Sequence, residues 1–294
     1  MLATWKQRDA YMNNKSSTRS WFAMAVALQF LVGCATPTLF SAPFPASTRT
    51  PIVEVVEDHP PSLGHPIGAF YSEASRTYFT GHQRGTGGYL AISLFATVVS
   101  HYANRAEGEA AFRRLLGEMD AGLANETRVN MTKKVNGDVS VTANRAKLTL
   151  RPTGIVSQQE DGSLSVLVEL RARQLDSNGT QVWSGNYFAP GTDSPLPPSS
   201  DITQTRELVK RALHVGIDRA TTVVSEQLRG NLVGETKITV TGRWPWIGDD
   251  GTVLEARVLG TVGSHTVLQL VSGGKQLYSG THLVAPETFR TVAR

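Results

Sequence analysis

The chain has 294 residues, of which 40% are hydrophobic and 18% are charged, as in an ordinary globular protein. Its formal charge is +4, but residues 1–33 carry four basic side chains and one acidic side chain, which leaves the rest of the chain near +1. That rest has no clustered basic stripe, which is the electrostatic footprint of nucleic-acid binding, so we expect no nucleic-acid partner.

The amino-terminal segment has the layout of a secretory signal peptide. Four basic side chains precede an apolar run of about twelve residues, from Trp21 to Val32. A helix needs roughly twenty residues to cross the hydrocarbon core of a bilayer, so this run is too short for a permanent anchor. We therefore predict that residues 1–33 are a signal peptide, with translation starting at Met1 or at Met12.

The apolar run ends in the motif Leu31-Val32-Gly33-Cys34. This motif resembles the lipobox of bacterial lipoproteins, in which a leucine and a pair of small or apolar residues precede a cysteine. The resemblance covers residues 1–35. It implies that the Cys34 thiol receives a diacylglycerol, that the leader is cut before it, and that the new amino group is acylated. Several acyl chains would hold the protein at a membrane, because each buried methylene contributes roughly 0.8 kcal/mol. An ordinary signal peptide with a chance cysteine is the alternative.

Two further details bear on the mature protein. Ala35 follows the cysteine, and in lipoproteins an aspartate at that place marks retention in the inner membrane, so the resemblance implies an outer-membrane protein facing the periplasm. Cys34 is the only cysteine, so its lipidation would leave no free thiol. Disulfides, thiolate metal sites and cysteine nucleophiles are therefore excluded.

The segment that follows is rich in proline, serine and threonine up to about Gly68. Proline at this density is incompatible with a helix or with a central strand. We predict that residues 34–68 are the lipidated cysteine and a Pro-rich tether, in which the β-branched run from Ile52 to Val56 adds one strand.

A glycine-rich loop, residues 81–88, opens directly into the apolar run 89–99, and a second helix is predicted over 106–123. Such a loop before a helix can bind a phosphate or another anion. Its glycine spacing, however, matches neither the dinucleotide-binding fingerprint nor the Walker loop. We therefore favour a flexible entry to a buried helix, with anion binding as the alternative.

The middle of the chain predicts three strands, over 147–156, 164–173 and 181–188. Asp161-Gly162 and Asn178-Gly179 lie between them and are strong signals for hairpin turns. In the second strand apolar residues alternate with polar ones, which predicts one buried face and one wet face. The polar positions that we assign to the wet face are Ser165, Glu169, Arg171 and Arg173.

A long helix is predicted to follow, because Asp201 and Gln204 form a capping-box-like start and Gly230 stands where a C-cap glycine belongs. Strands in a meander followed by a long helix predict the α+β class for residues 69–230, with helices packed on an antiparallel β meander. The pattern is similar to the periplasmic domains of outer-membrane lipoproteins in lipopolysaccharide assembly and of auxiliary lipoproteins of ABC transporters. The resemblance covers about 80 residues, implies a non-enzymatic role in assembly or transport, and transfers no functional residue.

In residues 231–294 the sequence pattern is that of short strands separated by glycine turns. This pattern predicts a separate small β-barrel of the SH3-like type. Trp244 and Trp246 flank Pro245 in this segment. The two indoles are our candidates for contact with a ligand or a partner, as an exposed stacking platform. Alternatively, they plug the open end of the barrel.

No catalytic or metal-binding pattern stands out in the sequence. The seven histidines lack the spacing of a zinc helix, and no Gly-x-Ser-x-Gly elbow occurs, although Ser264 directly precedes His265. We therefore predict no enzyme, no cofactor and no metal. The favoured hypothesis is a membrane-anchored scaffold or auxiliary protein of an envelope complex. The alternatives are a binding module for peptide, peptidoglycan or lipid, and an envelope enzyme.

Overall fold

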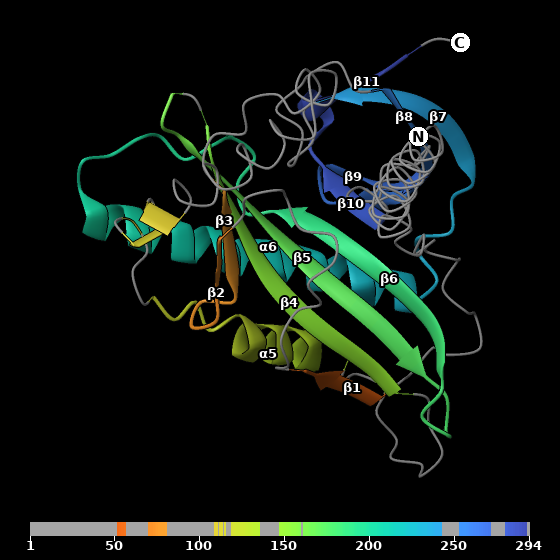
Figure 1. Ribbon diagram of the computed structural model, residues 1–294. Helices are drawn as coiled ribbons and strands as arrows, with labels where there is room; N and C mark the ends of the chain where they lie inside the picture. The colour runs from red at the N-terminus through yellow and green to blue at the C-terminus, as the bar shows by residue number, and fades with distance from the viewer. Residues whose placement is uncertain are drawn as a thin grey trace, which may run out of the picture. The chain divides into compact units, whose positions relative to one another are not determined.

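The computed structural model describes residues 52–56, 70–80, 109–110, 112–113, 115, 119–135, 147–159, 161–242, 253–271 and 280–292. The described part is a mixed structure in which an eleven-stranded, mostly antiparallel sheet packs against the helices α5 (Leu123–Val135) and α6 (Ile202–Leu228) (Figure 1). The α+β class predicted from the sequence is therefore confirmed.

The strands run in the order β11-β7-β8-β9-β10-β6-β5-β4-β3-β2, and β1 pairs with β4 beside that path. Neighbours are antiparallel except in the pairs β1–β4, β3–β4 and β10–β6. Their bounds are β1 (Ile52–Val55), β2 (Phe70–Ser72), β3 (Thr77–Thr80), β4 (Lys147–Gln158), β5 (Leu164–Leu175), β6 (Gln181–Pro190), β7 (Thr236–Gly242), β8 (Val253–Val262), β9 (His265–Val271), β10 (Gly280–Val284) and β11 (Phe289–Thr291).

The meander β4–β5–β6 forms where the sequence predicts it, with slightly longer strands. The β5–β6 turn differs in detail from a two-residue turn. The carbonyl oxygen of Asp176 accepts a hydrogen bond from the Gly179 amide at 3.1 Å, and Gly179 has φ +80°, whereas Asn178 is not in the left-handed region. This is the longer hairpin turn in which only the last position needs a glycine.

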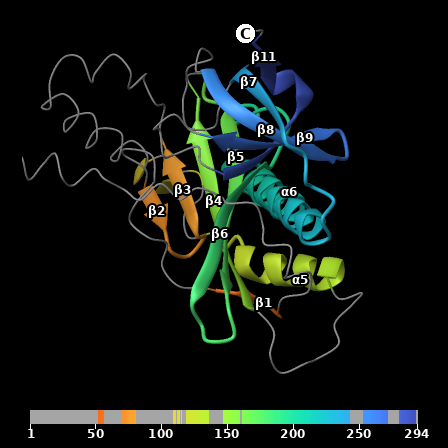
Figure 2. The same cartoon turned by 90° about the vertical axis from the view of Figure 1, so that its right-hand side faces the viewer.

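Helix α6 begins and ends as predicted. The Asp201 carboxylate accepts a hydrogen bond from the Gln204 amide at 3.0 Å, and Gly230 follows the C-cap residue. The helix packs on one face of β4–β6, and α5 lies beside it (Figures 1 and 2). A Cβ atom on Gly216 would lie 2.7 Å from Val168 Cγ2, so a residue without a side chain is needed where α6 meets β5.

The sequence prediction of a helix over 106–123 is confirmed for the described residues 109–110, 112–113 and 115, which are helical, but not for the end of that range. Residues 119–122 are not helical, and α5 begins only at Leu123. Gly122 has φ +61°, and its amide donates to the Asp120 carboxylate, so the chain turns here before the helix begins. The sequence pattern missed α5 because its buried face includes the polar residues Thr127 and Asn130. Strands β2 and β3 were also not predicted.

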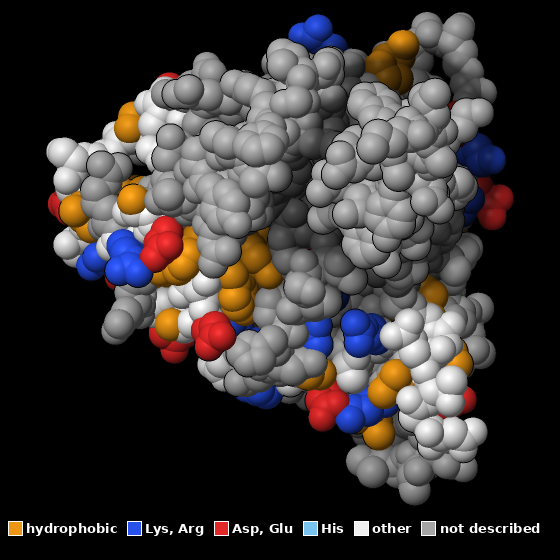
Figure 3. All heavy atoms as spheres, viewed as in Figure 1, with side chains coloured by type: hydrophobic (Ala, Val, Ile, Leu, Met, Phe, Trp, Pro, Cys, Tyr) orange, Lys and Arg blue, Asp and Glu red, His pale blue; other side chains and the backbone are white. Residues whose placement is uncertain are grey.

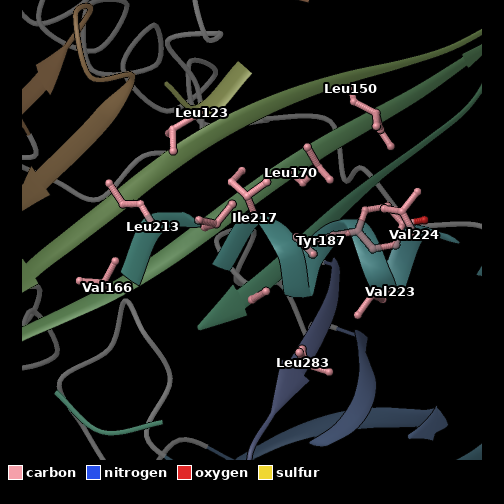
Figure 4. Close-up of a cluster of buried hydrophobic side chains, with 14 of the residues drawn as sticks. Leu123, Leu150, Val166, Leu170, Tyr187, Leu213, Ile217, Val223, Val224 and Leu283 are labelled. Atoms are coloured by element: carbon pink, nitrogen blue, oxygen red, sulfur yellow. The ribbon is translucent and has the colours of Figure 1, made fainter. Parts of the chain in front are cut away.

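The main hydrophobic core lies between the sheet and the two helices. Figure 4 shows Leu213 and Ile217 of α6 directed at strand residues such as Leu170, with Leu283 of β10 at the border of the same cluster. Neither α5 nor α6 combines the length and the hydropathy that a membrane span requires, and no other helix among the described residues does so.

The C-terminal strands correct the prediction of a small closed barrel. Among the described residues β7–β11 extend the large sheet, because β10 pairs with β6 in parallel through Thr281 opposite Tyr187 and His282 opposite Phe188. The sheet path is open, with β11 at one end and β2 at the other. Whether a sheet closes into a barrel depends on pairing between strands that are distant in the sequence. The local alternation of apolar and polar residues gives no information about that pairing.

Candidate functional site

The candidate contact residues named from the sequence, Cys34, Trp244 and Trp246, lie outside the described residues, as does the glycine-rich loop 81–88. Within the described part of the chain, two groups of polar side chains stand out. One lies on the sheet, on the side turned away from α6, which we call the non-helical face. The other joins the β6–α6 loop to α6 and to β9.

The register of β4, β5 and β6 places polar residues in rows across the non-helical face. Arg151 is directly opposite Arg171, which is opposite Asn186. The next row toward the C-terminal strands contains Glu169, opposite Phe188, which is in turn opposite His282 of β10. The face is therefore polar and charged near the β5–β6 turn and becomes aromatic where β10 joins.

Glu169 and Arg171 form a two-point ion pair in the middle of this face. Arg171 Nε lies 2.8 Å from Glu169 Oε1, and Arg171 Nη2 lies 3.3 Å from Oε2. Glu169 is only 4% exposed, so the sequence prediction of a wet position is wrong there. Burial of a carboxylate is tolerated because the guanidinium supplies charge and two donors, but a buried ion pair is itself weak evidence for stability. Because the ion pair lies in the middle of the face, it is a candidate for fixing a single conformation there, that is, for conformational specificity.

Aromatic rings lie next to this ion pair. The rings of Phe188 and His282 are stacked, with centroids 4.5 Å apart and an interplanar angle of 18°. Tyr71 and Tyr78 pair across β2 and β3 with centroids 4.6 Å apart. Burial raises the pKa of both phenols above the ordinary tyrosine range, so both remain neutral and can act only as uncharged hydrogen-bonding groups.

The end of the non-helical face near the β5–β6 turn is basic. Arg173 is exposed, and its β4 partner Thr149 donates a hydrogen bond to the Arg173 carbonyl oxygen at 3.3 Å. Lys147 forms an ion pair with Glu54 of β1. Figure 3 shows Lys and Arg side chains together with hydrophobic ones over this end of β1 and β4–β6. The arrangement can attract anions, and none of the side chains described there is placed for covalent chemistry.

The second group centres on Asp193 in the loop after β6. Its Oδ1 atom lies 2.9 Å from Arg219 Nη1 of α6 and 2.9 Å from His265 Nε2 of β9. Arg219 also donates to the Pro190 carbonyl oxygen at 3.0 Å. One carboxylate therefore links three elements that are distant in the sequence, and it ties the C-terminal strands to the helix.

The same group contains a serine, because Ser264 Oγ lies 3.3 Å from His265 Nδ1. Serine, histidine and aspartate are thus in contact in the order of a catalytic triad. In a triad, however, the aspartate is buried and orients the imidazole, whereas the Asp193 side chain is 49% exposed and bound to Arg219. The contact between neighbouring residues 264 and 265 is long and local. We therefore infer that this group holds the β6–α6 loop, α6 and β9 together through non-covalent contacts, and that it is not catalytic.

Asp193 gives a testable pH dependence. The hydrogen bond from His265 and the charge and hydrogen bond of Arg219 lower the pKa of Asp193, and partial burial acts in the opposite direction. A folded-state pKa below the unfolded value stabilises the protein above the unfolded pKa, and this contribution is lost as the pH falls through the folded pKa. We expect Asp193→Asn to lower the urea midpoint near neutral pH, by a small amount because the group is half exposed.

The difference between the parent chain and Asp193→Asn should disappear at acidic pH, where the parent carboxylate is protonated. Measuring the urea midpoint of both chains from neutral to acidic pH checks this. In an Arg219→Met background the same substitution should have a smaller effect, because one of its partners is gone. A difference that stays constant with pH would contradict the assigned ion pairs.

Sequence reasoning missed both groups. A separation of 72 residues lies between Asp193 and His265, and no local pattern signals their contact. The like-charged neighbours Arg171 and Arg173 were visible but were assigned to a solvated face. Among the described residues no three His, Cys, Asp or Glu side chains gather in a way that could hold a metal ion. No family model matches this chain, and no curated protein matches it.

Proposed function

We propose that this protein is a lipid-anchored lipoprotein of the bacterial outer membrane, facing the periplasm, with a non-catalytic scaffold or auxiliary role in envelope assembly, secretion or transport. The observation that carries the proposal is the motif Leu31-Val32-Gly33-Cys34, which holds the only cysteine and follows a basic leader and a short apolar run. Acyl chains on Cys34 would provide the anchor, and the residues between Cys34 and strand β1 the tether, because residues 52–55 of the predicted tether belong to the sheet.

The non-catalytic part of the proposal is supported by how the described polar side chains are used. Glu169 binds Arg171 on the sheet, and Asp193 binds Arg219 and His265 beside the helix. In both groups the charges neutralise each other within the protein. A catalytic site would instead direct a nucleophile, a base and hydrogen-bond donors at one common position for a reacting atom.

Substitution of Cys34 tests the anchor. We expect Cys34→Ser to abolish labelling by a fatty-acid analogue and to shift the protein from salt-washed, detergent-soluble membranes to the soluble fraction or to an uncleaved precursor. The matched control is Ser41→Ala, a nearby substitution that leaves the motif intact. Unchanged membrane retention of Cys34→Ser after the salt wash would contradict the anchor.

A binding module for peptide, peptidoglycan or lipid is the second candidate, and one observation favours it. Strands β7–β11 have the order β11-β7-β8-β9-β10, a 3₁₀ turn (Pro286–Thr288) precedes the last strand, and a second hydrophobic cluster includes Val240, Leu254 and Leu268. These strands belong to an open sheet and do not form a closed barrel among the described residues, so only their separate hydrophobic cluster favours this candidate, and the fold alone does not decide function. Co-sedimentation with isolated peptidoglycan that is lost in Trp244→Ala/Trp246→Ala would favour this candidate.

A further inference from the structure

Strand β1 is held at the edge of the sheet by few and exposed contacts. It has four residues and lies beside the start of β4, next to α5 (Figures 1 and 2). None of its side chains is buried: its two valines are half-buried, and Ile52 is 55% exposed. Glu54 pairs with Lys147, but the two side chains are 48% and 42% exposed, so this ion pair contributes little.

The edge of β4 that β1 covers is, by contrast, a well-formed site for an extended strand. The pairing is parallel and runs from Ile52 opposite Lys147 to Val55 opposite Leu150, and the Val56 amide donates to the Leu150 carbonyl oxygen at 2.9 Å. Leu148 and Leu150, which β1 borders, are fully buried. An uncovered strand edge is a ready template for pairing with another chain. The site therefore binds an extended segment that has valines at alternate positions.

We propose that β1 exchanges between two copies of this protein, so that β1 of one copy docks on the Lys147–Leu150 edge of β4 in the other. The printed register shows that the edge fits this segment, and a second copy carries the same segment. A mutual exchange regains every β1–β4 contact in the partner copy, which makes strand swapping a route to a dimer at low cost.

The position of β1 along the chain permits the exchange. It precedes all the other described elements, and 14 residues, 56–69, connect it to β2. A connection of that length spans at most about 50 Å, so β1 can reach a neighbouring copy while the rest of the sheet stays paired. The exchange itself needs no anchor. If Cys34 is lipidated as proposed above, copies on one bilayer would also meet at a high effective concentration.

The test detects β1 of one copy on β4 of another through a disulfide. The full chain with Cys34→Ser has no cysteine, so that every thiol is an introduced one. A donor chain carries Glu54→Cys and an acceptor chain carries Thr149→Cys, at positions that are register partners. Paired strands are about 5 Å apart, which a disulfide can bridge. The two chains carry tags of different mass, are mixed with oxidised glutathione, and are separated by non-reducing electrophoresis.

Two control chains accompany this mixture. A single chain with both Glu54→Cys and Thr149→Cys should form the bond within itself, which checks the register. A control donor carries Val215→Cys, at a position on α6 that is 42% exposed and remote in sequence from β1. Its yield with the same acceptor measures random encounter. Circular dichroism checks that each chain is folded.

We expect the mixed pair to form with Glu54→Cys, at an initial rate proportional to donor concentration, and much less with the control donor. Val53→Ser/Val55→Ser in the acceptor should raise that rate at least about tenfold, because the acceptor's own β1 then competes less for the edge. The same change in the donor should have little effect, since it weakens equally the contact that β1 leaves and the contact that β1 gains.

Three results would overturn the inference. The first is a mixed pair no more abundant than with the control donor, and the second is a bond that forms only within single chains. The third is an equal effect of Val53→Ser/Val55→Ser in donor and acceptor, which would indicate random contact of a loosened segment. All three are distinct from failure of the anchor, which is measured as membrane retention of the chain that keeps Cys34.

Discussion

We expect the Glu169→Leu variant to have a free energy of unfolding about 3–5 kcal/mol below that of the parent chain. The substitution removes both hydrogen bonds that Glu169 accepts from Arg171, and it leaves the guanidinium charge partly buried. It also leaves Arg171 directly opposite Arg151 without its neutralising carboxylate. The loss therefore comes mainly from an uncompensated charge, and not from lost packing area.

The double variant Glu169→Leu/Arg171→Leu separates these terms. With neither charge present, it should recover most of the stability, because apolar residues often replace a buried ion pair at little cost. Urea unfolding of the parent, the two single variants and the double variant gives the coupling energy.

The exposed pair Arg113–Glu109 is the matched control for this cycle, since the Arg113 side chain is 74% exposed. Its coupling should be only about 0.3–0.5 kcal/mol, as expected for pairs one helical turn apart. Additive losses in the cycle for Glu169 and Arg171 would show that the two side chains do not act as a unit, and would contradict the description of the face.

The second large effect concerns Leu283 of β10. We expect Leu283→Ala to cost about 2–5 kcal/mol, because the side chain is buried in the main core and its removal leaves a cavity. Strand β10 lies between β9 and β6, and Leu283 belongs to the same cluster as residues of α6 (Figure 4). The cavity should therefore weaken α6 as well as the C-terminal strands.

Hydrogen exchange of the amides in α6 and in β8–β9 measures this directly. In Leu283→Ala both groups should exchange faster by the same factor, and thermal unfolding should remain one transition. Val292→Ala, at an exposed position in the same part of the chain, is the control and should change stability by less than about 0.5 kcal/mol. Faster exchange in β8–β9 alone, with two thermal transitions, would instead support the boundary at 230/231 that the sequence predicts.

Local signals in the sequence were sufficient for the meander and for α6. Alternation of apolar residues marks β5, glycines such as Gly179 mark the turns, and Asp201 and Gly230 mark the two ends of the helix. Each of these signals works over a few residues, because strand pleating, turn dihedrals and helix capping are decided by near neighbours in the chain. The targeting motif ending in Cys34 is likewise a short pattern, and its role stays a prediction.

The two groups of side chains described for the candidate site are brought together by tertiary structure alone. The parallel pairing of β10 with β6 brings His282 beside Phe188, almost a hundred residues away, and the contact of Asp193 with His265 spans 72 residues. Alternation in β5 shows that Glu169 and Val168 point to opposite faces, but it does not show what lies over either face. Whether Glu169 is buried depends on which distant parts of the chain pack over its position. Pairing over such distances leaves no periodic pattern in the sequence.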